Sequence, residues 1–461
     1  MLFSGITFLY LFLPFMALYF IIPKSWRNGF LLAVSLIFYF FGEPIYVSLL
    51  IFSSIVDWLH GLFIEANRGK KSTKYALISS IVINVSLLGI FKYLDFFIAT
   101  INGIFGVNIP LTNISLPIGI SFFTFQTMSY TIDVYRGKAH AQKNFSSFMT
   151  YVCLFPQLIA GPIVRYTDVE KELENRDVTV SNVAEGIRRF SVGLGKKVLI
   201  ANLLGEICSN FQAANEKSVV FYWLYALAFT LQIYFDFSGY SDMAIGLGKV
   251  FGFNFPENFN YPFISRSISE FWRRWHITLG RWFRDYVYIP LGGNRVSGIK
   301  WVRNLAVVWL LTGFWHGAEW NFVLWGAMFG VILALEKLFL GKVLEKSPKF
   351  IGHIYTLFFV LMSFVIFNAE SFGEIFENFK GMFGVLDAPL INDIALYNLR
   401  SYAVILAVAI IGATPAPKIL WNRFKKGSSV ILEPIGAVLI LLVSTAFIIN
   451  GSFNPFLYFR F

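Results

Sequence analysis

Charged side chains are scarce in this sequence. Asp, Glu, Lys and Arg make up 14% of its 461 residues, whereas hydrophobic residues make up 56%. A soluble globular domain carries about 25% charged residues. The shortage excludes an ordinary soluble domain and predicts an integral membrane protein, an interpretation that the mean hydropathy of +0.63 supports.

Cysteine and the common catalytic loops are scarce as well. Cys153 and Cys208 form neither a disulfide framework nor a metal-ligand pattern, and we interpret both as small core residues. The chain contains no P-loop and no GxGxxG, and GYSDM at 239–243 lacks the last glycine of a G-x-S-x-G elbow, which makes Ser241 a poor candidate nucleophile. We expect no metal, no bound cofactor and no cleaved signal peptide.

Long apolar runs dominate both ends of the chain. By length and hydropathy we expect membrane helices at 5–22, 28–41, 45–64, 75–98, 117–134, 319–340, 351–368, 400–413 and 430–450. The loops between them alternate between basic segments and segments that are acidic or uncharged. Because cytoplasmic loops are enriched in Lys and Arg, both halves independently predict that the N-terminus and the C-terminus lie outside. The net charge of +11 is then explained by these loops and by anionic lipid, without nucleic acid.

The middle of the chain, about 144–300, is less regular. FPQ at 155–157 and GP at 161–162 break helices, and we interpret them as re-entrant backbone. The basic side chains of 183–211 predict a surface position; they are Arg188, Arg189, Lys196 and Lys197. The run 219–250 starts as a membrane span and then contains polar residues that we expect to face the protein interior: Asp236, Ser238, Ser241 and Asp242. The alternative is that these groups only hold helices together.

One imidazole lies inside a long apolar run. Residues 305–326 read LAVVWLLTGFWHGAEWNFVLWG, with His316 between Trp315 and Gly317. A titratable group at such a place is a functional-site hypothesis, because burying it in lipid is costly. A core or interfacial histidine bonded to a backbone carbonyl is the alternative, and the run alone does not decide between them.

A second histidine belongs to a basic, aromatic segment. SISE at 267–270 is a capping box, which predicts a helix from Ile268 onward. At roughly 100° per residue the helix would separate two faces. One face carries aromatic and aliphatic side chains together with His276, namely Trp272, Trp275, Leu279, Trp282, Phe283 and Tyr286. The other carries Arg273, Arg274, Arg281 and Arg284. These arginines either rest on anionic lipid or hold a phosphorylated donor.

Several stretches together resemble the membrane-bound O-acyltransferase family. They are FPQLIAGPIVRY at 155–166, YFDFSGYSDMAIGLG at 234–248, NFNYPFISRSISEFWRRWHITLGRWFRDYVYIPLGGNR at 258–295 and LTGFWHGAEWNFVLWG at 311–326. Among the family's members they resemble the membrane subunit of bacterial alginate O-acetylation, and the ending FNPFLYF at 453–459 fits as well. The resemblance implies an all-α, polytopic membrane protein in which a ring of about 10–12 transmembrane and re-entrant helices surrounds a central tunnel. It also implies one domain over 1–461, with N-terminal helices at 1–143, a catalytic core at 144–340 and C-terminal helices at 341–461.

The resemblance also implies a chemistry. The histidine of the family's W-H-G motif is catalytic and falls on His316, and the supporting histidine falls on His276. We expect Asp236, Ser238, Trp315 and Asn321 to line the tunnel. Histidine suits general-base catalysis because its pKa lies near neutrality. We therefore expect transfer of an acetyl group from a cytoplasmic thioester such as acetyl-CoA to hydroxyls of an exported polysaccharide.

Partners and alternatives follow from the same reasoning. Since the chain has no esterase-like domain of its own, an extracytoplasmic esterase-like acetyltransferase partner is implied, in addition to membrane lipid and the polysaccharide. The expected location is the bacterial inner membrane. Two alternatives stay open: D-alanyl transfer from a carrier protein to teichoic acid, and a secondary transporter, which would also use broken helices and inward carboxylates.

Overall fold

The computed structural model describes residues 3–424, 429–451 and 457, and all regular secondary structure in them is helical. Six helices are long and apolar enough to cross a membrane, or seven if α20 (Asp393–Ser401) and α21 (Ala403–Gly412), bent by 60°, form one span. The six are Val47–Ala66, Ser72–Phe105, Val219–Val250, Trp320–Lys346, Lys349–Asn368 and Ile431–Asn450. The prediction of an all-α polytopic membrane protein is confirmed. The tunnel ring stays a prediction.

The chain divides into two compact units. One comprises Met1–Phe190 and Met243–Pro256, and the other comprises Ser191–Asp242 and Glu257–Phe461. These boundaries differ from the segments 1–143, 144–340 and 341–461, and the single domain stays a prediction. Helix α12 (Val219–Val250) contributes to both units, and 78% of its most apolar window is buried, against 11% for α23 (Ser429–Asn450). The polar residues predicted to face inward therefore lie on the most enclosed of the spans.

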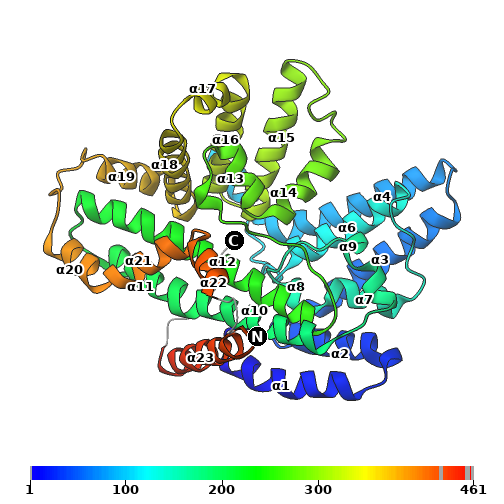
Figure 1. Ribbon diagram of the computed structural model, residues 1–461. Coiled ribbons are helices and arrows are strands. Elements are labelled where there is room, and N and C mark those ends of the chain that lie inside the picture. The colour runs from blue at the N-terminus through cyan, green and yellow to red at the C-terminus, as the bar shows by residue number, and fades with distance from the viewer. Residues whose placement is uncertain (1–2, 425–428, 452–456, 458–461) are drawn as a thin grey trace. The chain divides into compact units, whose positions relative to one another are not determined.

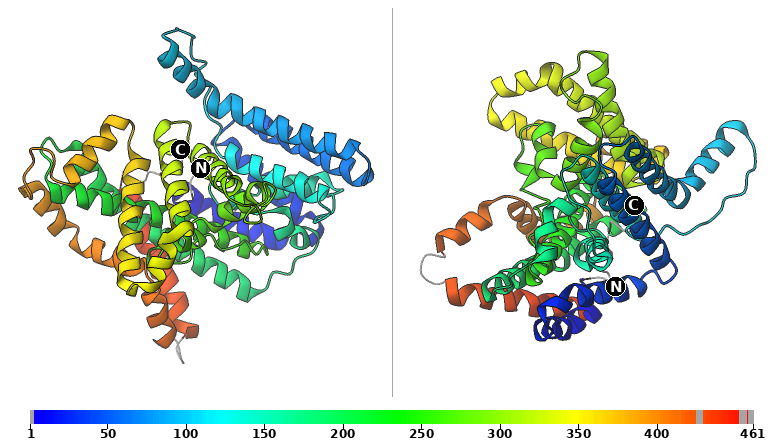
Figure 2. Two further views of the ribbon diagram at one scale, coloured as in Figure 1. Left: turned by 90° about the horizontal axis from the view of Figure 1, so that it is seen from above. Right: turned by 90° about the vertical axis from the view of Figure 1, so that its right-hand side faces the viewer.

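The first unit contains three helices that lie side by side, namely α3 (Val47–Ala66), α4 (Ser72–Leu88) and α6 (Ile120–Tyr135) (Figures 1 and 2). Phenylalanine rings pack elsewhere in the same unit, including Phe8, Phe38 and Phe155. The remaining helices are α1 (Ile6–Ile21), α2 (Arg27–Phe40), α5 (Leu94–Phe105), α7 (Phe145–Cys153), α8 (Phe155–Leu158), α9 (Tyr166–Glu174) and most of α10 (Val180–Gly195).

The second unit is built on α15 (Ile299–His316) and α16 (Trp320–Leu335), which pack along each other (Figure 1). Its core is formed by apolar side chains from α12, α13, α16 and α18 (Lys349–Asn368). The other helices are α11 (Asn202–Ala213), α13 (Ile268–Arg274), α14 (Ile277–Phe283), α17 (Gly341–Lys346), α19 (Phe372–Met382) and α22 (Ala416–Phe424).

Some local predictions are confirmed and others are wrong. Cys153 and Cys208 are both buried, and Ser267 caps α13 by accepting a hydrogen bond from the Glu270 N–H at 3.0 Å. The single helix expected from Ile268 to Tyr286 is wrong, because the backbone breaks at Trp275 and His276 and separates α13 from α14. Within the family-like ending 453–459, only Leu457 belongs to the described residues.

Candidate active site

His316 ends α15, with 6% of its surface exposed. Its Nδ1 lies 2.7 Å from the carbonyl oxygen of Thr312, one turn earlier. A carbonyl only accepts hydrogen bonds, so Nδ1 of the neutral ring carries the proton and donates it. Nε2 is then the nitrogen that accepts a proton. The ring is therefore fixed in orientation and in tautomer by its own helix.

Aromatic rings enclose this imidazole. Ring centroids lie 5.0 Å away for Trp315, 4.9 Å for Trp325 and 5.5 Å for Phe367, all in edge-on arrangements. Trp325 is on α16 and Phe367 is on α18, so three helices converge on the histidine. Such packing keeps bulk water away, and electrostatic interactions are stronger in a dry site than in water.

Small residues bring α15 and α16 close enough for this arrangement. A Cβ placed on Gly326 would lie 2.4 Å from the Trp309 carbonyl oxygen and 3.2 Å from the Gly313 Cα. No larger residue fits at this crossing, which is a common arrangement between membrane helices. Asn321 fixes the adjoining end of α18, because its Nδ2 donates to the carbonyls of Phe367 at 3.1 Å and Ala369 at 2.8 Å.

A cavity of about 20 Å³ adjoins His316, enough for roughly one water molecule. His316 and Asp236 are its polar side chains, and the rest of the wall is apolar or aromatic. The lining residues are Ile233, Asp236, Phe237, Trp275, His316, Trp325, Phe364, Phe367 and Leu457. An imidazole and a carboxylate therefore share a small, largely apolar space.

His276 lies at the break between α13 and α14, with a left-handed backbone (φ 42°) that is unusual for a residue with a side chain. Asn258 holds it there. The Asn258 Oδ1 accepts from the Thr278 N–H at 3.3 Å and the Thr278 hydroxyl at 2.9 Å, and lies 3.1 Å from the His276 Nδ1. Because Oδ1 is an acceptor, Nδ1 of His276 donates, and Nε2 is the acceptor nitrogen of the neutral ring.

Trp315 touches both histidines. Its ring centroid lies 5.7 Å from that of His276 and 5.0 Å from that of His316. The His276 Nε2 is buried and has no hydrogen-bond partner in the described part of the chain, and the same holds for the indole N–H of Trp325. The site thus combines two histidines with fixed tautomers and an indole donor without a protein partner.

Asp236 is buried beside the cavity and is paired with Lys197, whose Nζ lies 2.7 Å from Oδ1. Both side chains are 3% exposed, so the surface position predicted for Lys197 is wrong. Lys197 belongs to η3 (Lys196–Ala201), a π-helical turn between α10 and α11 that places it against α12. Lys196 and Asp242 form a second pair, at 2.6 Å, that is partly exposed.

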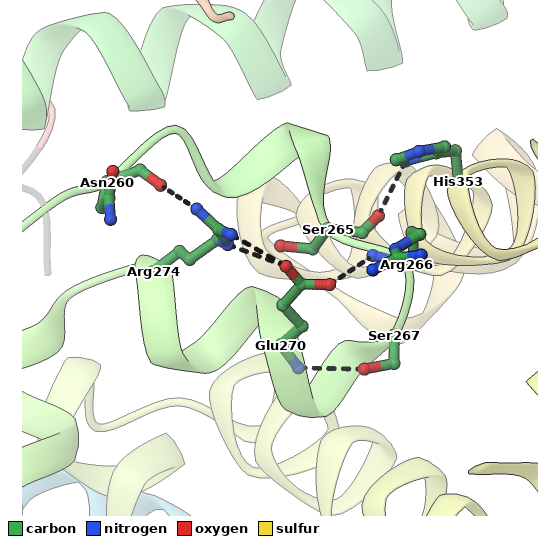
Figure 3. Close-up of polar contacts among 7 residues, drawn as sticks. All are labelled: Asn260, Ser265, Arg266, Ser267, Glu270, Arg274 and His353. Atoms are coloured by element: carbon green, nitrogen blue, oxygen red, sulfur yellow. Dashed lines mark hydrogen bonds and ion pairs between the residues drawn. The ribbon is translucent and has the colours of Figure 1, made fainter. Parts of the chain in front are cut away.

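The four arginines proposed for donor binding differ in their surroundings. Arg274 pairs with Glu270 at 2.9 Å, as Figure 3 shows, and Arg284 pairs with Asp285 at 2.7 Å. Arg273 is exposed and Arg281 is half-buried. Burial alone would raise the pKa of Glu270, but the Arg266 N–H and the Arg274 guanidinium hold it below its usual value. The segregation of buried aromatic side chains from more exposed arginines, expected from the sequence, is confirmed although the helix is broken.

The structure brings some predicted residues together and separates others. His316, His276 and Asp236 gather around the cavity or its aromatic wall, whereas Ser238 is buried without lining it. Trp315 contacts the histidines, and Asn321 anchors α18. Sequence reasoning missed Lys197 and Asn258. Nothing in the sequence around Asn258 marks it as a partner of a histidine, because only the fold brings it to His276.

Comparison with known proteins gives the context of this geometry. A family model described as the membrane-bound O-acyltransferase family matches residues 84–373, a range that contains both histidines and Asp236. The probable alginate O-acetylase AlgI of Azotobacter vinelandii is 39% identical over an alignment that covers 100% of both chains. The chain belongs to the membrane-bound O-acyltransferase family. As a member it is a multi-pass membrane enzyme that transfers acyl groups.

Two enzymes named for other acyl transfers are also similar to this chain. The peptidoglycan O-acetyltransferase of Helicobacter pylori is 33% identical, over 100% of this chain and 98% of that protein. The teichoic acid D-alanyltransferase of Bacillus subtilis is 28% identical, over 57% of this chain and 71% of that protein. The family resemblance expected from the sequence is therefore confirmed, and the secondary transporter is disfavoured.

Proposed function

We propose that this acyltransferase moves an acetyl group from a cytoplasmic thioester, acetyl-CoA, toward hydroxyls of an exported polysaccharide, with His316 as general base. The observation that carries the proposal is the bond from the His316 Nδ1 to the Thr312 carbonyl. It leaves Nε2 as the proton acceptor of a buried ring beside a small, mostly apolar cavity. The full-length similarity to proteins named as O-acetylating enzymes supports acetyl as the group transferred.

The proposed transfer involves the acceptor hydroxyl, the thioester and the His316 imidazole. An acceptor hydroxyl oxygen attacks the thioester carbonyl carbon, a C–O bond forms, and the hydroxyl proton passes to the Nε2 of His316. The tetrahedral oxyanion then collapses, the C–S bond breaks, and the thiolate leaves with the proton from the imidazolium. General-base help of this kind contributes roughly 10²–10⁴-fold in rate. The enclosing rings disfavour hydrolysis of the thioester by water.

His276 has a supporting role in this proposal. Its Nδ1 donates to Asn258, so its neutral Nε2 accepts hydrogen bonds and does not donate to an oxyanion. The indole N–H of Trp325, on the cavity wall, is the better candidate for that donation.

The donor side uses an exposed arginine. Arg273 is the candidate for binding the phosphates of the thioester carrier, because carboxylates already neutralise Arg274 and Arg284. We infer from the basic loops that this face lies at the cytoplasm and both termini lie outside, in the bacterial inner membrane. An esterase-like partner outside the membrane completes delivery to the polymer.

The proposal is tested with membranes that contain the protein and [¹⁴C]acetyl-CoA, by measuring label in the exported polymer. We expect transfer by the wild type and none above background by His316→Ala at equal membrane insertion. A D-alanyl carrier protein is supplied in parallel. Labelling of the polymer from the carrier alone would overturn acetyl-CoA as the donor. Wild-type acetylation by membrane-inserted His316→Ala would overturn the assignment of His316 as the base.

A further inference from the structure

Two consecutive lysines each form an ion pair with an aspartate of α12. Lys197 pairs with Asp236 at 2.7 Å, and Lys196 pairs with Asp242 at 2.6 Å. Both lysines belong to the π-helical turn η3. Such turns are rare and are frequent at functional sites. The two pairs join the same two elements, so they differ mainly in their surroundings.

Only the Asp236 pair is fully enclosed and reaches the cavity. Its two side chains are 3% exposed, and Asp236 lines the cavity together with His316, whereas Lys197 does not. The Asp242 pair is 25% and 17% exposed and is absent from the cavity lining. The Asp236 carboxylate therefore faces the cavity next to His316, whereas the Lys197 ammonium lies outside the cavity lining.

Each member of the Asp236 pair also makes a hydrogen bond to a further residue. The Lys197 Nζ donates to the Asn202 Oδ1 at 2.9 Å, and the Asp236 Oδ2 accepts from the Leu457 N–H at 3.0 Å. Taking two charges out of water is costly, and a buried pair often stabilises a fold no better than apolar residues of the same size. Stability alone therefore does not explain why a buried ion pair lies beside the His316 cavity.

We propose that Asp236, held in place by Lys197, is a positioning residue that presents a fixed negative charge to the His316 cavity and stabilises the imidazolium formed during acyl transfer. This inference rests on the proposed function, since it needs His316 to take up a proton. No hydrogen bond or ion pair joins the carboxylate to His316 in the described part of the chain, so it acts through its electric field across an enclosed, mostly apolar cavity, where charges interact more strongly than in water.

The sign of the effect follows from the charges around His316. Asp236 is negative and closest to the cavity, and Lys197 partly offsets it from behind. His276 is the other imidazole, and Glu319 and Glu370 are exposed carboxylates that follow His316 and α18 in the chain. A negative charge favours the protonated ring, so removing it makes His316 harder to protonate.

The first test is Asp236→Asn, which keeps the side-chain shape and an acceptor for the Leu457 N–H. We expect the plateau rate of acetyl transfer to fall roughly tenfold or more, since the transition-state charge is less stabilised. The acidic limb of the pH–rate profile should move to lower pH by on the order of one pH unit, because a tenfold weaker preference for the protonated ring lowers its pKa by about one unit. Asp242→Asn is the matched control and should keep both the rate and the limb.

The second test exchanges the charges, Lys197→Asp with Asp236→Lys. A merely structural pair would be restored by this exchange in both stability and activity. We expect the folded double variant to stay strongly impaired, because a positive charge now faces the cavity. Wild-type activity of the exchanged protein, or an Asp236→Asn acidic limb that does not move, overturns the inference. An active His316→Ala protein would instead overturn the proposed function, so the two failures are distinguishable.

Discussion

Two buried carboxylates on membrane-spanning helices have opposite surroundings. Asp57, on α3 of the first unit, and Asp236, on α12, are both almost fully buried. Among the described residues, the hydrogen-bond partners of Asp57 are neutral: its Oδ1 accepts from the hydroxyls of Ser80 and Thr131, and its Oδ2 accepts from the Asn84 amide. Asp236 instead meets a buried ammonium and a cavity shared with an imidazole.

The difference shows how structural and functional polar groups are separated in this chain. The Asp57 cluster ties α3, α4 and α6 together, because its members come one or more from each helix and bond to one another. Around His316 two buried polar atoms have no hydrogen-bond partner among the described residues: the indole N–H of Trp325, on the cavity wall, and the Nε2 of His276, whose ring packs against Trp315. Burial of a titratable group is shared by both regions, so burial alone does not identify the site.

Breaking the Asp57 cluster should give the largest effect on stability. Asp57→Leu leaves buried donors of Ser80 and Asn84 without an acceptor, and an orphaned buried donor costs roughly 1–3 kcal/mol. We expect a loss of about 2–5 kcal/mol in total, read as a lower melting temperature in detergent. Asp57→Asn, which keeps one oxygen, should lose less.

The activity of Asp57→Leu tests whether the Asp57 cluster and the His316 site have separate roles. The specific activity of the remaining folded Asp57→Leu protein should stay within about twofold of the wild type, as expected for a cluster that shares no hydrogen-bond partner with His316 among the described residues. If the folded variant loses acetyl transfer as severely as His316→Ala, the cluster is part of the active site and the contrast between the regions disappears.

Releasing His276 should give a smaller effect, confined to activity. Asn258→Leu removes the acceptor that fixes the His276 Nδ1 and Thr278. Removing a partner that orients a metal-bound histidine costs about 10–100-fold in activity, and we expect a loss at the lower end of this range for the supporting His276. Asn254→Leu, four residues earlier, is the control, because Asn254 is exposed and its amide bonds to Glu172, so the substitution should leave activity unchanged. Equal rates in the two variants would show that the ring needs no such support.

The sequence predicted most helices because their signals are local. Apolar length placed α1, α2, α18 and α23 close to their observed bounds, and the SISE capping box placed the start of α13. The break after α13 was not predicted, since nothing in RRWHI marks a left-handed residue. Tertiary contacts impose it: the Ile277 N–H donates to the Asn258 carbonyl at 2.9 Å, and the Asn258 side chain holds His276.

The site was predictable in its histidines and less so in their partners. His316 and His276 stand out as titratable groups among aromatic residues, and the family motifs single them out. Lys197 looked like a surface lysine because its neighbours are basic, and a π-helical turn alters the register on which helical-face arguments rely. Long-range pairs such as Lys197 with Asp236 leave no trace in local sequence, so only the fold reveals them.

One pair of variants tests the central claim most directly. His60, on α3, makes the same bond as His316, with its Nδ1 2.7 Å from the carbonyl of Val56 four residues earlier. The initial rate of acetyl transfer per inserted molecule is measured for His316→Ala and His60→Ala in the same membranes. We predict a fall of roughly 10²–10⁴-fold for His316→Ala and a rate close to the wild type for His60→Ala. Equal rates in the two variants would contradict the account.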